Sequence, residues 1–599
     1  MLNQPLRDRV VDWLLPRVQT PGQYIGGEWN SVCKDYAAVR GKFCLAFPDT
    51  YAIGMSNHGL QVLYAVMNRR SDWACERAFM PLADMEALLR ENGLPLFSLE
   101  NFTPLVEFDV LGFTLQHDLC YTNVLAMLEL GGIPVRAAER TPAHPLVMAG
   151  GPCASNPEPM AAFIDLFLLG DGEEMLPEVC RLWLEGKQAG GDRGAIMAAI
   201  ARRLPCVYVP RFYEPHLDPA GRPAGVRPLG DDLPAQIEPA VLADLDAVPL
   251  PTAPVVPHVE CVQDRITIEI MRGCPWRCRF CQSSTIKRPV RTRRIETIVR
   301  AALESYRNTG HNEVSLLGLS TGDYPGLEDL LRRLDETFRP LGVSTSLPSL
   351  RINESWRWLG ELLRTDRRDG LTLAPEAARD DMRRQIGKQI TNDDLLEGCR
   401  RAMQNGFLRV KLYFMCGLPG ERPADLDGII DMAEEISRLG KRVAGRAATV
   451  VANVSNFVPK PQTPYQWNAM QRREYFEQAH ERLRRRKRLR SVTLRCHDVD
   501  ASLLEGVLCR GDRRVGPAIE LAFRRGARLD AWAERLRPWL WWQALADAGI
   551  DVEDLLHRPR PPDAPLPWDH IQVRQGRAYL EREQQRSAEH LAEMSCGGQ

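Results

Sequence analysis

The stretch MRGCPWRCRFCQSS, residues 271–284, contains the only close grouping of cysteines in the sequence. Cys274, Cys278 and Cys281 follow the spacing C-x3-C-x2-C. The other cysteines of the sixteen are scattered singly, and such residues usually behave as small buried apolar groups. The triplet directly follows ITIEIM, which is the first expected strand of an alternating strand–helix series. The triplet therefore marks the start of a predicted strand–helix unit.

Six apolar segments, each followed by a helical pattern, predict an α/β unit over residues 259–485. They are ITIEIMRG, EVSLLGLS, VSTSLPSL, GLTLAPE, RVKLYFMCGLPGE and TVVANVSNFVPKP. This pattern predicts a partial (β/α)6 barrel, whose chemistry belongs at the carboxyl ends of the strands. Lys460, at the end of the sixth strand, is a candidate substrate contact.

Residues 1–205 repeat a strand–turn–helix pattern in KFCLAFP, EFDVLGFTL, PLVMAGGP and FIDLFLLGDGEE. Such βα units predict a doubly wound, flavodoxin-like parallel sheet. Residues 206–258 are rich in proline and are predicted to form an extended linker. Residues 486–599 are predicted to form a mainly helical C-terminal domain.

The overall composition is that of an ordinary globular protein. Hydrophobic residues make up 44% and charged residues 26%, and the net charge of -1 gives no general attraction to nucleic acid or membranes. No segment approaches the roughly 20 apolar residues of a membrane helix, and the first residues lack a signal-peptide core. We expect a cytoplasmic protein without membrane partners and without disulfides.

Three thiolates on one short loop can each bind one iron of a cubane cluster and leave the fourth iron open. Zinc is the alternative, but it usually takes four protein ligands with paired spacings. The sequence has no matching second C-x2-C or H-x3-H pair. The triplet therefore predicts a [4Fe–4S] cluster bound by Cys274, Cys278 and Cys281.

The same stretch resembles the signature of the radical S-adenosylmethionine (SAM) superfamily, C-x3-C-x-aromatic-C. The resemblance implies that SAM binds the open iron and is cleaved by an electron to a 5′-deoxyadenosyl radical. It makes Phe280 the aromatic residue beside the adenine, with plain core packing as the alternative. It also implies an electron donor of the flavodoxin or ferredoxin type.

Three strand-end turns are similar to SAM-binding turns of this superfamily. Ser320-Thr321-Gly322-Asp323 departs from the usual Gly-Gly-Glu-like turn but keeps its polar character. For Glu376, at the end of the fourth strand, the alternative is a carboxylate in a surface turn. For Gly417 and Gly420, after the fifth strand, the alternative is a simple tight turn. The contacts that the resemblance implies are Thr321, Gly322, Asp323, Glu376, Gly417 and Gly420.

The N-terminal segment DTYAIG, residues 49–54, resembles the cobalamin motif D-x-H-x-x-G with tyrosine in the histidine position. Two later strand ends resemble the S-x-L and G-G elements of the same kind of domain. The alternative is a flavodoxin-like domain whose glycines serve only its turns. The residues that the resemblance assigns to cobalamin are Asp49, Tyr51, Gly54, Thr114, Gly150 and Gly151.

The order of domains resembles radical SAM proteins with a cobalamin-binding domain, and within them an uncharacterised bacterial family. Stretches such as LLGDGEE, RPVRTR and RGDRR carry that resemblance. It implies a possible radical-SAM-linked partner protein but supplies no substrate. The basic segment RPVRTRR (288–294) either binds an anionic substrate, the SAM carboxylate or an electron donor, or is a solvated helix start. The segment ERLRRRKRLR (481–490) either contacts RNA phosphates or covers a domain seam.

The leading functional prediction is a cobalamin-assisted methyltransferase that uses the radical to activate an unreactive carbon. A second hypothesis keeps the radical but omits cobalamin, which leaves a rearrangement, an oxidation or an RNA modification. A third is an iron–sulfur binding or sensor protein that does not cleave SAM. The substrate, the reductant and the oligomeric state do not follow from the sequence.

Overall fold

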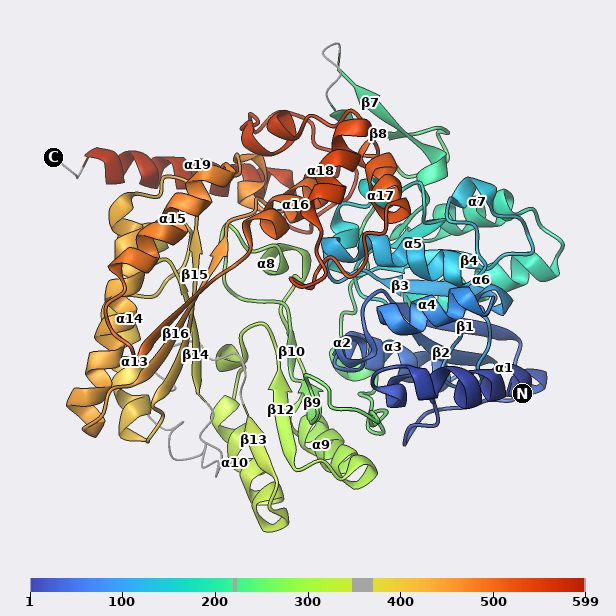
Figure 1. The fold of residues 1–599 in the computed structure, drawn as a ribbon, viewed down its shortest axis with the longest axis horizontal. Coiled ribbons are helices and arrows are strands. Elements are labelled where there is room, and N and C mark those ends of the chain that lie inside the picture. The colour runs from blue at the N-terminus through green and yellow to red at the C-terminus, as the bar shows by residue number, and fades with distance from the viewer. Residues whose placement is uncertain (1, 219–222, 347–369, 597–599) are drawn as a thin grey trace.

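The computed structural model describes residues 2–218, 223–346 and 370–596. Its N-terminal part is a six-stranded sheet in the order β2-β1-β3-β4-β5-β6, at the right of Figure 1. All neighbouring pairs are parallel except β5 and β6. The order of the first five strands is that of flavodoxin, so the predicted fold class is confirmed. The strands are β1 (Gly41–Phe47), β2 (Trp73–Phe79), β3 (Val110–Thr114), β4 (Leu146–Gly150), β5 (Leu166–Leu168) and β6 (Val207–Tyr208).

Helices cover both faces of this sheet because its strands are apolar on both sides. Phe43 and Leu45 of β1 pack with three helices on one face, while Cys44 and Ala46 pack on the other. The first face carries α3 (His58–Asn68), α6 (Met175–Gln188) and α7 (Arg193–Arg203). The second carries α1 (Gln4–Arg9), α4 (Ala83–Glu91) and α5 (Tyr121–Leu130). This is the two-sided cover expected of a parallel sheet.

Strand β2 was not predicted, because its sequence WACERAF interrupts an apolar run with two charges. All seven residues are nevertheless buried. The Arg77 guanidinium donates to Glu100 at 2.6 Å and to Glu28 at 3.0 Å. The carboxylate of Glu76 accepts from Ser98 and Asn101. An ion-paired arginine and a hydrogen-bonded glutamate therefore occupy positions that apolar side chains usually fill.

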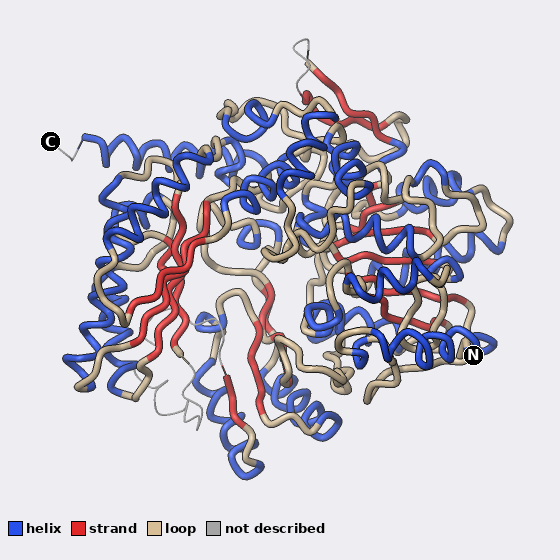
Figure 2. The backbone as a smooth tube through the Cα atoms, viewed as in Figure 1, coloured by secondary structure: helices blue, strands red, loops and turns tan. Residues whose placement is uncertain are grey.

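The second α/β unit has a three-stranded sheet, β13-β12-β9, and a four-stranded sheet, β14-β15-β16-β17. Figure 2 shows the two groups of strands diverging from each other, at the lower centre and the left. Residues 347–369, which include the end of the expected strand VSTSLPSL, lie outside the described residues. The strands are β9 (Ile266–Glu269), β12 (Glu313–Leu317), β13 (Ser344–Ser346), β14 (Leu371–Glu376), β15 (Arg409–Cys416), β16 (Thr449–Asn456) and β17 (Val492–Cys496).

All six strand positions expected in this unit are present, and one strand was missed. Strand β17 pairs in parallel with β16 although it lies beyond residue 485, where a mainly helical region was expected. Its short sequence VTLRC follows an arginine-rich helix and gives little strand signal. The helices packed around this unit are α9 (Ile295–Thr309), α10 (Leu327–Phe338), α12 (Asp380–Gln385), α13 (Asn392–Gln404), α14 (Pro423–Ala444) and α15 (Arg473–Arg486).

The proline-rich segment and the C-terminal region join the two units. The segment begins with β6, continues in a hairpin of β7 (Tyr213–Leu217) and β8 (Pro223–Pro228), and later forms the β-bridges Gly170–Ala240 and Ile237–Ile571. The C-terminal helices are α16 (Val499–Arg510), α17 (Val515–Arg524), α18 (Pro538–Asp547) and α19 (Arg577–Cys596). One hydrophobic cluster runs from Leu6 to Ile571, so both units share a core. Among the described helices, none has the length and apolarity needed to cross a membrane.

Replacing Arg77 tests the buried charges of β2. We expect Arg77→Met to destabilise the protein by about 3–5 kcal/mol, because it leaves Glu28 and Glu100 buried without a cation. The matched control is Arg136→Met, which breaks the ion pair of a half-exposed arginine with Glu520 and should cost less than about 1 kcal/mol. Thermal unfolding of both variants checks this. Equal shifts would contradict the assigned role of Arg77.

Candidate active site

The cysteine triplet lies in a loop between β10 (Met271–Arg272) and α8 (Ser283–Ile286). Strand β10 pairs with β11 (Arg291–Thr292), which folds the chain back on itself. Gly273 opens the loop with φ of +85°, and a Cβ atom there would lie 2.7 Å from the carbonyl oxygens of Lys287 and Pro289. Only glycine fits this close approach without strain.

Several hydrogen bonds hold the loop in place. The Trp276 indole donates to Asp323 at 2.6 Å. Arg288 donates to the carbonyl oxygens of Pro275 and Trp276 at 3.1 and 2.9 Å. Arg279 donates to the carbonyl of Gln385 at 2.5 Å. The loop is therefore bound to the turn after β12, to the segment that follows α8 and to the end of α12.

The three thiols fit the donor set of a cubane cluster. All three cysteines are partly exposed, and burial raises the pKa of the Cys281 thiol. In the described residues, no group of three or more His, Cys, Asp or Glu side chains is arranged to hold a single metal ion. A cubane does not require such an arrangement, because each thiolate binds a different iron. Binding to iron would also favour the thiolate form that burial disfavours.

Phe280 lies against an apolar cluster at the carboxyl ends of three strands. Ala377 follows β14, Leu418 follows β15 and Phe457 follows β16, and all three are buried. Tyr465 packs edge-on against Phe457, with ring centres 5.8 Å apart. This apolar wall beside the cysteine loop is where the predicted adenine contact of Phe280 would have to be made.

Glu376, the last residue of β14, has an unusual backbone. Its φ is +67°, although it is not a glycine, and the pairing of β14 with β15 shifts just before it. Its carboxylate accepts from Lys388 at 3.2 Å. Burial raises the pKa of Glu376, and Lys388 opposes that rise. Strained residues of this kind cost about 1–3 kcal/mol and cluster at functional sites.

The other predicted SAM residues are held by contacts within the chain. Thr321 and Gly322 are buried in a 3-10 turn after β12, and Asp323 accepts from Ser320 as well as Trp276. Gly417 and Gly420 both have positive φ after β15. A Cβ atom would lie 2.6 Å from Phe476 at the first and 2.2 Å from Leu591 at the second. Close packing therefore explains both glycines.

A cavity lies at the carboxyl edge of the N-terminal sheet, where the strand order reverses between β1 and β3. It has a volume of about 390 Å³, and Asp49, Thr114, His117 and Trp532 are among its lining residues. The Trp532 indole donates to Asp49 at 2.9 Å, so the C-terminal region covers this edge. Ligands of doubly wound folds bind at such a switch point.

The remaining residues of the predicted cobalamin motif point elsewhere. Tyr51 is buried and donates to Glu28 at 3.1 Å. A Cβ atom on Gly54 would lie 2.3 Å from Phe79, and one on Gly151 would lie 2.7 Å from a backbone oxygen. Both glycines are thus needed for packing, whereas Gly150 would meet only one atom, at 3.1 Å.

The carboxyl edge of the N-terminal sheet faces the cysteine loop. The Gln282 side chain donates to Ser155 at 2.9 Å, and Ser155 follows β4. Lys460, the predicted substrate contact, bridges the same seam, because its ammonium binds Asp118 at 2.8 Å and Glu505 at 2.6 Å. The positive charge of Lys460 is therefore balanced by two carboxylates of the protein, and the structure gives it no separate role toward a substrate.

Sequence reasoning missed Arg272, which directly precedes the loop. It binds Asp171 at 3.0 Å, Glu173 at 2.6 Å and Glu269 at 2.8 Å. Arg272 lies in the motif MRGC, and its partners Asp171 and Glu173 lie in the motif LLGDGEE. Sequence spacing alone does not show that these two motifs are in contact.

The two basic segments are largely neutralised within the chain. Arg291 binds Asp171 at 2.5 Å, while Arg482 and Arg486 bind acidic residues of α14. In the second segment, these ion pairs join α15 to α14. They fit the prediction that the segment covers a domain seam.

Substitution of Gly54 distinguishes packing from cofactor contact. We expect Gly54→Ala to destabilise the protein by about 1–3 kcal/mol without any ligand, because the added methyl overlaps Phe79. Gly516→Ala in α17 is the control, since its nearest atom would be 3.5 Å away and alanine favours helices. Thermal unfolding of both proteins is the measurement. An unchanged unfolding temperature for Gly54→Ala would refute the packing explanation.

Comparison with known proteins agrees with this site. Residues 268–433 match the model of the radical SAM superfamily, and residues 59–210 match the model of the N-terminal domain of radical SAM proteins. "Uncharacterized protein MJ0966" from Methanocaldococcus jannaschii is 26% identical over 450 residues, which cover 73% of this chain and 86% of that protein.

Two solved structures show a weaker likeness. The radical SAM methyltransferase TsrM from Kitasatospora setae, with cobalamin and a [4Fe–4S] cluster bound, gives a TM-score of 0.48 at 15% identity, covering 92% of this chain and 99% of that chain. The cobalamin-dependent radical SAM enzyme OxsB gives 0.43 at 11% identity, covering 80% of this chain and 66% of that one. The two family matches together span more than half of the chain and include the cysteine loop, so the chain belongs to the radical SAM superfamily, whose enzymes use a [4Fe–4S] cluster and S-adenosylmethionine.

Proposed function

We propose that this radical SAM enzyme transfers a methyl group to an unactivated carbon with the help of a corrinoid. Cys274, Cys278 and Cys281 would bind the cluster, and the corrinoid would lie on the carboxyl edge of the N-terminal sheet. The observation that carries the proposal is that this edge meets the cysteine loop, through the hydrogen bond from Gln282 to Ser155. Two reactive groups can act on one substrate only if their sites share a cavity or an edge.

When bound, the cluster would supply the electron that cleaves SAM, and the corrinoid would supply the methyl group. The chain positions and shields these groups. Trp276 and Arg288 fix the loop that carries the cysteines. Phe280 and the buried residues Leu418 and Phe457 would exclude water from one side of SAM. An electron donor of the flavodoxin or ferredoxin type would reduce the cluster.

Glu376 is the best-supported polar contact for SAM. Its carboxylate is buried at the end of β14, and its charge interacts with Cys281. The Lys388 ammonium donates to this carboxylate at 3.2 Å and restricts the conformation of the Glu376 side chain. A strained, buried carboxylate beside the cysteine loop is suited to accept hydrogen bonds from a ribose or an ammonium group.

The corrinoid part of the proposal is supported by the switch-point cavity and by the motif that follows β1. Asp49 and Thr114 line the cavity, as the motif requires. The buried Tyr51 provides no ligand to cobalt. A radical reaction without corrinoid is the second candidate function, because Gly54 and Gly151 serve packing and the cavity, at about 390 Å³, is small for a whole corrinoid.

Cysteine substitution tests the cluster. Anaerobically reconstituted wild-type protein should convert SAM to 5′-deoxyadenosine under a low-potential reductant. Cys274→Ser, Cys278→Ser and Cys281→Ser should each lose the cluster absorbance and at least about 1,000-fold of this activity, because one iron loses its ligand. The control Cys33→Ser alters an exposed cysteine on a distant segment and should behave like wild type. Retained activity in all three variants would rule out the assigned ligands.

Corrinoid content separates the two candidate functions. Protein produced with hydroxocobalamin should contain about one corrinoid per chain by absorbance. Thr114→Trp should lose the corrinoid while keeping the cluster, because the larger side chain fills the switch-point cavity that Thr114 lines. Gly516→Leu, on a helix of the C-terminal region, is the control for general damage. Cluster-loaded wild-type protein without corrinoid, but active on SAM, would favour the second function.

A further inference from the structure

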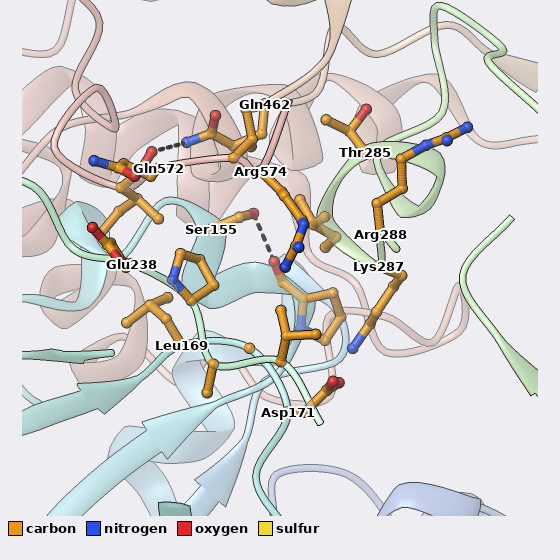
Figure 3. A pocket seen from close by; sticks show the side chains of 18 of the residues that line it. Ser155, Leu169, Asp171, Glu238, Thr285, Lys287, Arg288, Gln462, Gln572 and Arg574 are labelled. Atoms are coloured by element: carbon orange, nitrogen blue, oxygen red, sulfur yellow. Dashed lines mark hydrogen bonds between the residues drawn. The ribbon is translucent and has the colours of Figure 1, made fainter. Parts of the chain in front are cut away.

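A second cavity lies where the N-terminal sheet, the proline-rich segment, the cysteine-loop helix and the C-terminal segment meet. Its volume is about 280 Å³, which is the space of about nine water molecules. Figure 3 shows the N-terminal sheet below it, the C-terminal segment above it and the green helix α8 beside it. No residue that the preceding sections assign to SAM or to the cluster lines this cavity.

Cationic side chains dominate its lining. Four of them, Lys287, Arg288, Arg291 and Arg574, stand against two carboxylates, Asp171 and Glu238. The cavity therefore has a surplus of positive charge. Whether this surplus can reach a ligand depends on which of these side chains are already bound.

Two of the arginines are occupied. Arg288 points away from the cavity in Figure 3 and donates to the cysteine-loop carbonyls of Pro275 and Trp276. Arg291 binds Asp171 at 2.5 Å and the carbonyl of Leu242 at 2.7 Å. These two arginines form contacts within the protein, so we do not assign them to a ligand.

Lys287 and Arg574 are different. Within residues 2–218, 223–346 and 370–596, no hydrogen bond or ion pair engages the Lys287 ammonium or the Arg574 guanidinium. Figure 3 shows both side chains directed into the cavity from separate elements, with Arg574 beside Ser155. Burial lowers the pKa of Lys287, and the nearby carboxylates of Asp171, Glu173 and Glu269 oppose this change without cancelling it, so an anion beside the ammonium would favour its charged form further.

The carboxylates do not cancel these two cations. Asp171 is already bound by Arg272 and Arg291 and accepts from the backbone N–H of Leu242. Glu238 is exposed and lies on the other side of the cavity from Lys287 in Figure 3. The positive charge of Lys287 and Arg574 is therefore available to a ligand.

We propose that this cavity is a phosphate site, in which Lys287 and Arg574 bind the phosphate group of a small ligand. Phosphate matches the two charges, and the guanidinium fork suits its oxygens. The space admits a phosphate and a few further atoms. Because Lys287 stands six residues after Cys281, directly after the helix that leaves the cysteine loop, such a ligand would bind next to the loop. The proposal does not depend on the corrinoid.

Calorimetric titration with inorganic phosphate tests the site. Reconstituted protein in phosphate-free buffer is titrated at constant ionic strength, so that screening does not change. Wild type should show saturable binding of one phosphate per chain. Lys287→Gln and Arg574→Gln should each weaken it about tenfold or more, which corresponds to the loss of one charged hydrogen bond.

Controls separate a lost site from a damaged protein. Arg446→Gln changes an exposed arginine on the loop before β16 and should bind phosphate like wild type. Lys287→Arg keeps the charge and should retain most of the affinity. Every variant should keep the wild-type unfolding temperature and 5′-deoxyadenosine formation. The proposal is overturned if wild type shows no saturable binding, or if Lys287→Gln and Arg574→Gln bind as tightly as Arg446→Gln.

A phosphate group can reach the cavity on a free metabolite or as the phosphodiester of a corrinoid tail. Competition distinguishes these sources. Displacement of phosphate by hydroxocobalamin but not by cobinamide, which lacks the tail, would assign the cavity to the tail. Displacement by neither would assign it to a free phosphorylated ligand. Either result supports the phosphate site.

Discussion

The arrangement of the whole molecule depends on the ion pairs of Arg272. This side chain lies two residues before Cys274 and binds three carboxylates, Asp171 and Glu173 from the N-terminal unit and Glu269 from β9. All four groups are nearly excluded from solvent, so removal of the cation would leave Glu173 and Glu269 short of a close cation, while Asp171 would keep Arg291. The start of the cysteine loop is therefore tied to both α/β units at once.

This constraint brings two carboxyl edges together. The first belongs to the flavodoxin-like sheet and ends in the switch-point cavity, and the second carries Glu376 and the apolar wall around Phe280. The C-terminal helix α19 completes the enclosure, because Glu583 accepts from Arg279 at 3.2 Å and Leu591 packs on Gly420. A radical intermediate needs such an enclosure, since oxygen and unintended hydrogen donors would quench it.

Much of this could be predicted from local sequence. Strand–turn–helix patterns identified both α/β units, and the cysteine spacing identified the loop. The misses share a physical cause. Strand β2 is buried because distant carboxylates pair with Arg77 and distant hydrogen-bond donors satisfy Glu76, and no periodicity reports such contacts. The orientation of Tyr51 toward Glu28 and the contact of α19 with the loop also depend on residues far apart in sequence.

The central claim is that the cysteine loop holds a cubane cluster with one iron free for SAM. Electron paramagnetic resonance of anaerobically reconstituted, reduced protein during titration with SAM tests it most directly. The account predicts a [4Fe–4S]⁺ signal whose g-values and intensity change as SAM saturates the protein. A protein without such a signal, or a signal that SAM leaves unchanged, would contradict the account.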